Sequence, residues 1–262
     1  MIFYLQAELK QYFSNQQPLF DQIMSLRGEC YREQKGRLTQ RIQLGNKFYF
    51  IKQHRGIGWK EIIKNMLQLR WPVLGAKDEW QAITSLQSLG VATPSVVGYG
   101  QRGKNPATMQ SFILMEELTP VVSLEELCGR WPQHAPSFVL KKRLLHKVAE
   151  IARTMHHHGI NHRDFYICHF LLDQKQFDAN QLTLYLIDLH RAQRWSTIPS
   201  RWVIKDLAGL YFSSKEIGLT SRDHLRFIAR YCDMPWRDVL SSNKKVWQRV
   251  KTRGEQLYRD HQ

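Results

Sequence analysis

Several features that mark other protein classes are scarce in this sequence of 262 residues. It has only four cysteines, none in C-x-x-C spacing, so we expect reduced structural thiols and neither a zinc knuckle nor a disulfide framework. No apolar run approaches the roughly 18 residues that a membrane-spanning helix needs. The first ten residues lack a basic segment and include Glu8, which argues against a secretory signal. Low-complexity segments and internal repeats are also missing, which leaves an ordinary globular chain of one large domain or two small lobes.

Acidic residues are few relative to basic ones. Lys and Arg number 38 and Asp and Glu 23, which gives a formal net charge of +15. A surface of this kind attracts anionic partners, namely nucleic acid, anionic lipid, or an acidic protein or substrate. Charge alone does not choose among them.

The first half of the chain predicts a three-stranded antiparallel meander. Apolar and polar residues alternate over 38–44, Gly45-Asn46 is a turn signal, and 47–52 is the returning strand. An earlier strand over 28–33 would be joined to the second through a turn that contains Gly36 and two cations. Lys52 closes the third strand.

Two helices and two strands are expected next. Apolar residues at helical spacing predict a basic amphipathic helix from Trp59 to Trp71, which either rests on an anionic membrane or packs on its own domain. A second helix runs from about Ala76 to Leu89, with Glu79 one position off its apolar face. Short strands over 96–97 and 112–115 follow, separated by a loop over 98–108.

The second half places two carboxylates at the ends of apolar segments. A helix is predicted over 137–158, and its last turn carries three consecutive histidines. Their partial positive charge suits the helix dipole, and because they point in different directions they are poorly placed to bind one metal ion. Asp164 follows in a loop, and a strand over 182–187 ends in Asp188. Each carboxylate is either a turn residue or a functional group, with a metal ion the usual partner of a strand-end Asp.

These parts follow one another in the order found in kinases: a meander, a strand lysine, a helix glutamate, His162-Arg163-Asp164 and a strand-end Asp. The chain resembles the eukaryotic-kinase-like superfamily along essentially its whole length. The segment 162–172 is specifically similar to the bacterial lipopolysaccharide core heptose kinases. The resemblance implies an α+β, bilobal protein-kinase-like fold, with an antiparallel-sheet N-lobe over 1–116 and a mostly helical C-lobe over 117–262.

The resemblance also implies roles for individual residues. Lys52 would bind the α- and β-phosphates of ATP and pair with Glu79, although Glu61 is a rival partner. Asp164 would accept the proton of the acceptor hydroxyl, and Asp188 would hold Mg²⁺. Further ATP contacts are expected from the turn and from the backbone after the last strand of the N-lobe, namely Lys35, Gly36, Arg37, Met115, Glu116 and Leu118.

Three departures from protein kinases affect the interpretation. His169 stands where those enzymes have a metal-binding Asn, so it either ligates the metal or supports the core. The phosphate-covering turn has one glycine instead of three. Asp188-Leu189-His190 replaces Asp-Phe-Gly and no Ala-Pro-Glu follows, which favours a small-molecule or glycolipid acceptor over a peptide. Asp206 resembles the buried Asp that anchors the catalytic loop.

The function that the resemblance implies is ATP- and Mg²⁺-dependent phosphorylation of a heptose in the inner core of lipopolysaccharide. The expected partners are the inner-core acceptor, an anionic inner-membrane surface on its cytoplasmic face, and an acidic protein such as acyl carrier protein, but no nucleic acid. Arg191, Arg194 and Arg201 either reach the anionic acceptor or form a solvated loop. The alternatives are a catalytically degenerate kinase fold that acts as a scaffold or binds nucleic acid, and another small-molecule kinase.

Overall fold

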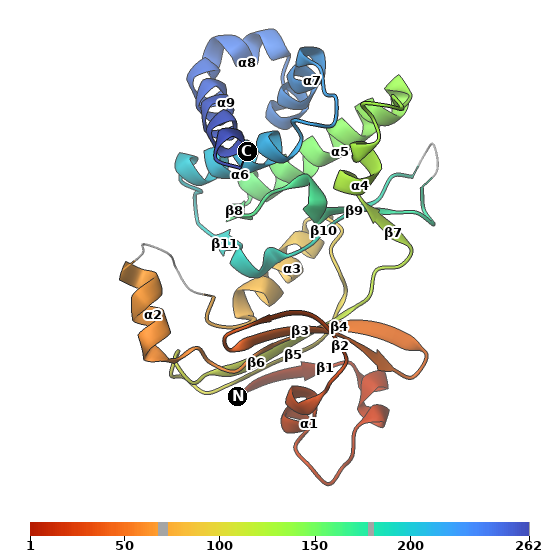
Figure 1. Ribbon diagram of the computed structural model, residues 1–262, viewed down its shortest axis with the longest axis vertical. Coiled ribbons are helices and arrows are strands. Elements are labelled where there is room, and N and C mark those ends of the chain that lie inside the picture. Colours follow the sequence, from red (N-terminus) through yellow and green to blue (C-terminus); the bar gives the residue numbers. More distant parts are fainter. Residues whose placement is uncertain (68–72, 178–180, 262) are drawn as a thin grey trace. The chain divides into compact units, whose positions relative to one another are not determined.

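The computed structural model describes residues 1–67, 73–177 and 181–261 (Figure 1). It divides the chain into two units, one made of residues 1–84 and 94–118, the other of residues 85–93 and 119–262. In the described residues, no helix is both long and apolar enough to cross a membrane.

The first unit is built on a six-stranded antiparallel sheet in the order β1-β5-β6-β4-β3-β2 (Figure 1). Its strands are β1 (Ile2–Leu5), β2 (Glu29–Gln34), β3 (Arg37–Leu44), β4 (Lys47–His54), β5 (Val96–Arg102) and β6 (Gln110–Glu116). The predicted meander, β2 to β4, is confirmed. Its third strand continues past Lys52 to His54, because β6 pairs with β4 as far as His54 and Ser111.

The N-terminal segment completes this unit and was not predicted. β1 pairs with β5 at the sheet edge, and α1 (Leu19–Ser25) packs its buried side chains Phe20 and Ile23 into the sheet core. That core also contains Ile51, Phe112 and Leu114. A four-residue strand is too short to show a period, so β1 could not be predicted from the pattern of its residues.

The loop predicted over 98–108 is wrong in its first part, because β5 continues to Arg102. Two glycines lowered the strand propensity of this segment. They are required by packing: a Cβ on Gly100 would lie 2.4 Å from Cε1 of the buried Phe112. Glycine therefore stands in this strand to make room for an aromatic ring.

Two helices link the sheet strands. α2 (Gly58–Leu67) and α3 (Lys77–Ser88) correspond to the two predicted helices. The predicted end of the first, including Leu69 and Arg70, lies outside the described residues.

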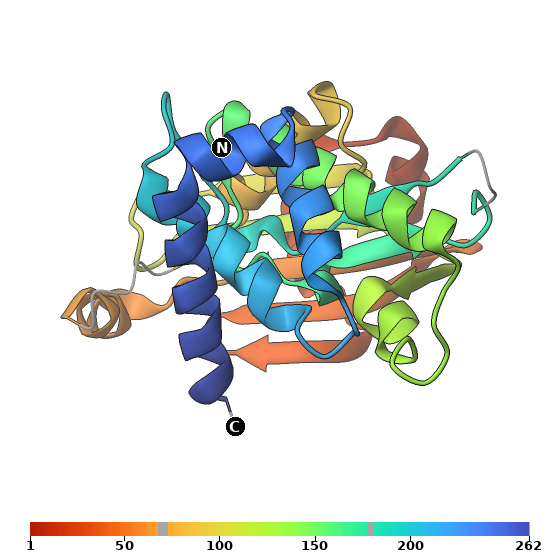
Figure 2. The same cartoon turned by 90° about the horizontal axis from the view of Figure 1, so that it is seen from above.

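The second unit is mostly helical. Its longest helix is α5 (Phe138–His157), which begins after the N-cap Ser137 and ends as predicted before Gly159. Helix α6 (Ser200–Ser213) packs against α9 (Lys244–Arg259), and α7 (Ser221–Cys232) packs against α5 (Figure 2). The remaining α-helices and strands of this unit are α4 (Leu124–Gly129), α8 (Trp236–Ser242) and the short strands β7 (Val121–Ser123), β8 (Ile160–Asn161), β9 (Phe170–Asp173), β10 (Leu184–Leu186) and β11 (Gln193–Arg194).

Candidate active site

A buried ion pair joins the sheet to α3 in the first unit. Lys52, on β4, is 9% exposed and Glu79 is 1% exposed. Nζ of Lys52 donates to Oε1 of Glu79 at 2.5 Å. Glu61 lies 3.7 Å from Nζ of Lys35 instead, so the structure pairs Lys52 with Glu79.

The turn between β2 and β3 is shaped by Gly36. This residue has φ +73°, and its carbonyl accepts a hydrogen bond of 2.8 Å from the amide of Arg55. A Cβ at this position would lie 2.4 Å from the carbonyl oxygen of Gly56, so no other residue fits without a shift of the backbone. The turn is therefore closely packed on the segment after β4, with Lys35 exposed beside it.

The end of β6 is held on both sides by backbone hydrogen bonds. The amide of Glu116 donates to the carbonyl of Ser95 at 3.0 Å, and the amide of Glu117 donates to that of Phe48 at 3.1 Å. Met115 is buried, whereas Leu118 is half-buried. The segment predicted to meet the adenine base is thus ordered by the sheet.

The loop that carries Asp164 is anchored from α6 in the second unit. Asp206 is fully buried and accepts hydrogen bonds from the amides of His162 at 2.6 Å and Arg163 at 2.8 Å. These bonds hold Arg163 at φ +75°, a conformation that costs a non-glycine residue about 1–3 kcal/mol. The predicted anchoring role of Asp206 is confirmed.

Two stacked histidines connect this loop to the strand end at Asp188. Nε2 of buried His162 donates to the carbonyl of Ile187 at 3.0 Å, and burial lowers the pKa of this imidazole. The ring of His169 stacks on that of His162 with centroids 5.5 Å apart. Nδ1 of His169 donates to the carbonyl of Asp164 at 2.7 Å, and its Nε2 lies 3.8 Å from Oδ2 of Asp188. The structure thus brings Asp164, His169 and Asp188 together within this unit.

The two carboxylates have partners that the sequence did not predict. Asp188 adopts a left-handed conformation at φ +60°, and its Oδ1 accepts a 2.6 Å hydrogen bond from Nδ1 of His190. One guanidinium nitrogen of Arg191 lies 2.8 Å and 3.2 Å from the two carboxylate oxygens of Asp164. No sequence pattern signals these contacts, because a turn of 3-10 helix over Leu189–Arg191 sets the directions of the side chains.

The three histidines at the end of α5 do not gather into one site. His156 is buried, with Nδ1 2.9 Å from the hydroxyl of Tyr231, while Nδ1 of His158 lies 2.8 Å from the carbonyl of Thr154. Among the described residues there is no group of three or more His, Cys, Asp or Glu side chains placed to hold a metal ion.

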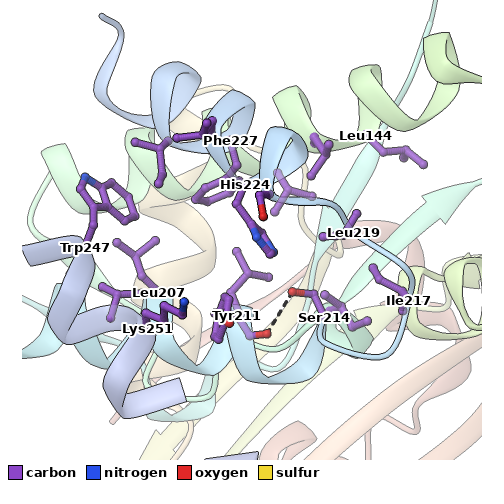
Figure 3. Close-up of a pocket in the computed structure, with 18 of the residues that line it drawn as sticks. Leu144, Leu207, Tyr211, Ser214, Ile217, Leu219, His224, Phe227, Trp247 and Lys251 are labelled. Carbon is purple, nitrogen blue, oxygen red and sulfur yellow. Dashed lines mark hydrogen bonds between the residues drawn. The ribbon is translucent and has the colours of Figure 1, made fainter. Parts of the chain in front are cut away.

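A separate apolar cavity of about 570 Å³ lies among the helices of the second unit (Figure 3). Its walls come from α5, α6, α7 and α9, and they include Leu144, Leu207, Tyr211, Phe227, Trp247 and Lys251. The sequence did not predict it, because a cavity depends on how helices pack rather than on any local pattern.

The sheet with its buried lysine–glutamate pair, and the anchored loop that brings Asp164 near Asp188, define a protein-kinase-like fold. A solved structure described as WaaP in complex with acyl carrier protein matches with a TM-score of 0.85 and 41% identity, covering 98% of this chain and 100% of that one.

Sequence comparisons identify the family. The model of the Lipopolysaccharide kinase (Kdo/WaaP) family matches residues 21–231. The lipopolysaccharide core heptose(I) kinase WaaP of Pseudomonas aeruginosa is 46% identical over 97% of this chain and 95% of its own length. The protein of the same name from Escherichia coli K12 is 47% identical over 91% of this chain and 90% of its own length. The chain belongs to the lipopolysaccharide kinase (Kdo/WaaP) family and is a kinase.

Proposed function

We propose that this kinase transfers the γ-phosphoryl group of ATP to a hydroxyl of a heptose in the inner core of lipopolysaccharide. The observation that carries this proposal is the cluster of Asp164, His169 and Asp188, ordered by Asp206 and His162, in a chain nearly half identical to proteins named heptose(I) kinases. Phosphoryl transfer needs positioning and charge neutralisation more than covalent chemistry, and the cluster offers both.

ATP would be held by the residues that the sequence indicated. Lys52, oriented by Glu79, would contact the α- and β-phosphates. Lys35, Gly36 and Arg37 would cover the phosphates, with the two cations supplementing the backbone donors of a turn that has one glycine. The backbone at Glu116 and Leu118, beside Met115, would pair with adenine. These assignments follow from the likeness to kinases and from the order of the parts.

The donor set near Asp188 fits Mg²⁺ that is also bound by substrate phosphates. Mg²⁺ prefers oxygen ligands and is commonly held by one or two carboxylates together with phosphate oxygens. Because Nδ1 of His169 donates to a carbonyl, Nε2 is the ring nitrogen that could act as a ligand, and it lies 3.8 Å from Oδ2 of Asp188. Two acceptor atoms at this distance suit a cation between them. Bound Mg²⁺ would neutralise charge on the phosphates that leave and transfer.

Asp164 would orient the acceptor hydroxyl and take its proton. Its main chain is fixed on both sides, by Asp206 through the amide of Arg163 and by Nδ1 of His169 through its own carbonyl. The carboxylate contacts Arg191, which would steady it until the acceptor binds. A general base held in this way typically accelerates transfer by about 10²–10⁴-fold.

A direct transfer assay tests the proposed function. Purified protein is incubated with γ-labelled ATP, Mg²⁺ and lipopolysaccharide whose heptose lacks phosphate, and the labelled sugar is identified by NMR. We expect label on a heptose hydroxyl. ATP turnover with an aminoglycoside or choline as acceptor, but not with the core, would point to another small-molecule kinase. Tight DNA binding without any transfer would point to a degenerate kinase fold.

An acidic acyl carrier protein is the protein partner that we propose. The solved relative is described in complex with acyl carrier protein. Helix α9 carries six cations, at 244, 245, 249, 251, 253 and 259, against a single carboxylate, at 255, and it also lines the apolar cavity. A basic helix beside an apolar cavity suits an acidic protein that presents an acyl chain, with the chain in the cavity (Figure 3).

Chain length separates this proposal from simple charge attraction. Each buried methylene adds about 0.8 kcal/mol, so acyl carriers with longer chains should raise the melting temperature progressively above the value with the unacylated carrier. The same melting-temperature series is measured for Phe227→Ala, which alters the cavity wall, and for Phe177→Ala, a control at the surface. Equal stabilisation by acylated and unacylated carrier would show that the acyl chain does not bind in the cavity. Purification of the free protein as a monomer at low salt would count against an acidic protein partner.

We further propose that the kinase works at the cytoplasmic face of the inner membrane, where an anionic surface would attract it. Helix α2 supports this. Ile62 is buried, but Trp59, Ile63, Met66 and Leu67 are exposed beside Lys60 and Lys64. Exposed apolar side chains flanked by lysines are typical of a helix that rests on anionic lipid.

A further inference from the structure

Three cations gather around one tryptophan beside the loop of Asp164, and a fourth lies close to two of them. The charged groups of Arg163, Arg201 and Lys205 lie 5.2, 5.4 and 5.6 Å from the ring centroid of Trp202. Arg191 is close enough for its charge to act on both Arg163 and Lys205. All of these residues belong to the second unit. We call this group the Trp202 cluster.

The positive charge of the Trp202 cluster exceeds the negative charge that faces it. The carboxylates whose charges act on Arg163 and Lys205 are Asp164 and Asp206, whereas the cluster contains four cations. Asp206 already accepts from two backbone amides, and Asp164 is in contact with Arg191. Among the described residues named here, the cations of the cluster therefore outnumber the carboxylates.

The cluster contains close like charges and, within the described part of the chain, buried donors without a hydrogen-bond partner. Burial, and then the charges of Arg163 and Arg191, lower the pKa of Lys205. Nε of Arg163 and the indole Nε1 of Trp202 are buried without a hydrogen-bond partner among the described residues. Unsatisfied buried donors and close like charges both destabilise a fold, and they persist where function needs them. The site is reachable, since Arg201 is exposed and the side chain of Arg191 is 33% exposed.

We infer that the Trp202 cluster is an oxyanion site that binds a carboxylate of an acidic sugar next to the acceptor heptose. The inference rests on the proposed function and adds a recognition element to it. Arg191 contacts Asp164, and its charge acts on Arg163 and Lys205, so an anion bound by the cluster would lie near the proposed base. A planar carboxylate matches the fork of an arginine guanidinium. The family to which the chain belongs is named for Kdo, which is a sugar acid.

The test removes one charge on each side of the contact. Lys205→Gln and Arg201→Gln are compared with Arg130→Gln, an exposed arginine of the same unit outside the cluster. Acceptors are the core with its acid sugars intact, the core with those carboxyl groups reduced to alcohols, and the intact core with its lipid phosphates removed. Arg191 is left unchanged because it touches Asp164.

For the intact core we expect each cluster variant to raise the acceptor KM about tenfold with kcat nearly unchanged, the loss expected for one charge-assisted hydrogen bond. With the carboxyl-reduced core, the acceptor KM of the wild type should also rise about tenfold. On that acceptor the KM of each cluster variant should exceed the wild-type KM by less than about twofold. Removing the lipid phosphates from the intact core should leave the difference in acceptor KM between the wild type and the cluster variants unchanged. Because Lys205→Gln relieves repulsion, it should melt no lower than the wild type.

An unchanged acceptor KM in both cluster variants would overturn the inference, as would a fall in melting temperature for Lys205→Gln without a change in KM. Loss of the difference on removing lipid phosphates would overturn the carboxylate assignment. These failures differ from failure of the proposed function itself, in which the wild type labels none of the three acceptors.

Discussion

Lys52 and Glu79 lie almost wholly inside the first unit, where each charge depends on the other. A charge left alone in a protein interior costs several kcal/mol, whereas exposed pairs contribute little. The same two residues are proposed to orient ATP. The same ion pair would therefore contribute both to the stability of the fold and to the binding of ATP.

We predict that Lys52→Ala lowers the free energy of unfolding by about 3–5 kcal/mol, because it leaves the buried carboxylate of Glu79 unpaired. Removing both charges with Lys52→Met and Glu79→Leu should recover much of that stability but not activity. Urea unfolding provides the measurement. The exposed pair of Arg230 and Glu150 is the control, and Arg230→Ala should cost no more than about 1 kcal/mol. If Lys52→Ala also cost no more than about 1 kcal/mol, the Lys52–Glu79 pair would contribute no more to stability than an exposed pair does.

How much of the site the sequence could predict is clear from these residues. The order of Lys52, Glu79, Asp164 and Asp188 along the chain was enough to nominate them, because each stands at a recognisable position on a strand, helix or loop. The contacts of Arg191 with Asp164 and of His190 with Asp188 were not foreseeable. They depend on a left-handed residue at the strand end and on a short helical turn, which single-sequence patterns do not reveal.

Among the elements, helix α7 begins with a reciprocal cap that also ties it to α5. Asp223 is buried and accepts hydrogen bonds from Thr220, in a capping box, and from Lys141 on α5. Burial raises the pKa of Asp223, but the bonds from Thr220 and Lys141 outweigh it and bring the pKa from 3.8 to about 2. The ionised form is therefore the one that stabilises the fold.

This shift gives a pH prediction. The contribution of Asp223 should be fully present above about pH 4 and be lost as the pH falls towards about 2, a total of roughly 2 kcal/mol. We expect Asp223→Asn to be less stable than the wild type at pH 7, with a difference that shrinks between pH 4 and pH 2. Asp260→Asn, at an exposed position, serves as the control. A difference that is constant over that interval would contradict the assignment.

Helix α2 gives a second prediction at this scale. Lys60→Glu with Lys64→Glu should weaken binding to liposomes that contain anionic lipid and reduce transfer to membrane-embedded acceptor, while ATP binding stays intact. The effect should shrink as salt rises, because charges are screened over roughly 8 Å at physiological ionic strength. Flotation assays measure this, and Lys104→Glu with Lys175→Glu is the control of equal charge. Unchanged binding at low salt would mean that the helix only packs on its own unit.

Element prediction from the sequence succeeded where the period was long and failed where it was short or interrupted. Helix α5, with twenty residues, and strand β3, with its alternating pattern, could be predicted from the sequence. The four residues of β1 and the glycines of β5 were not, because the pairing of these strands is decided by partners distant in the sequence.

For the whole molecule, the net charge of +15 is consistent with all three anionic partners that we propose: the inner-core acceptor, the membrane surface and an acidic carrier protein. We propose a different basic region for each of them. The Trp202 cluster would serve the acceptor, α2 the membrane and α9 the carrier. Variants confined to one region should therefore leave the other two interactions unchanged.

The central claim is that Asp164 is the base of a phosphoryl transfer to a heptose, and single-turnover transfer from labelled ATP to dephosphorylated core tests it most directly. Asp164→Asn keeps the shape of the side chain but removes its capacity to accept the proton. We predict that the rate falls by about 10²–10⁴-fold while ATP affinity and melting temperature stay close to those of the wild type. A correctly folded Asp164→Asn protein that transfers phosphate at nearly the wild-type rate would contradict the account.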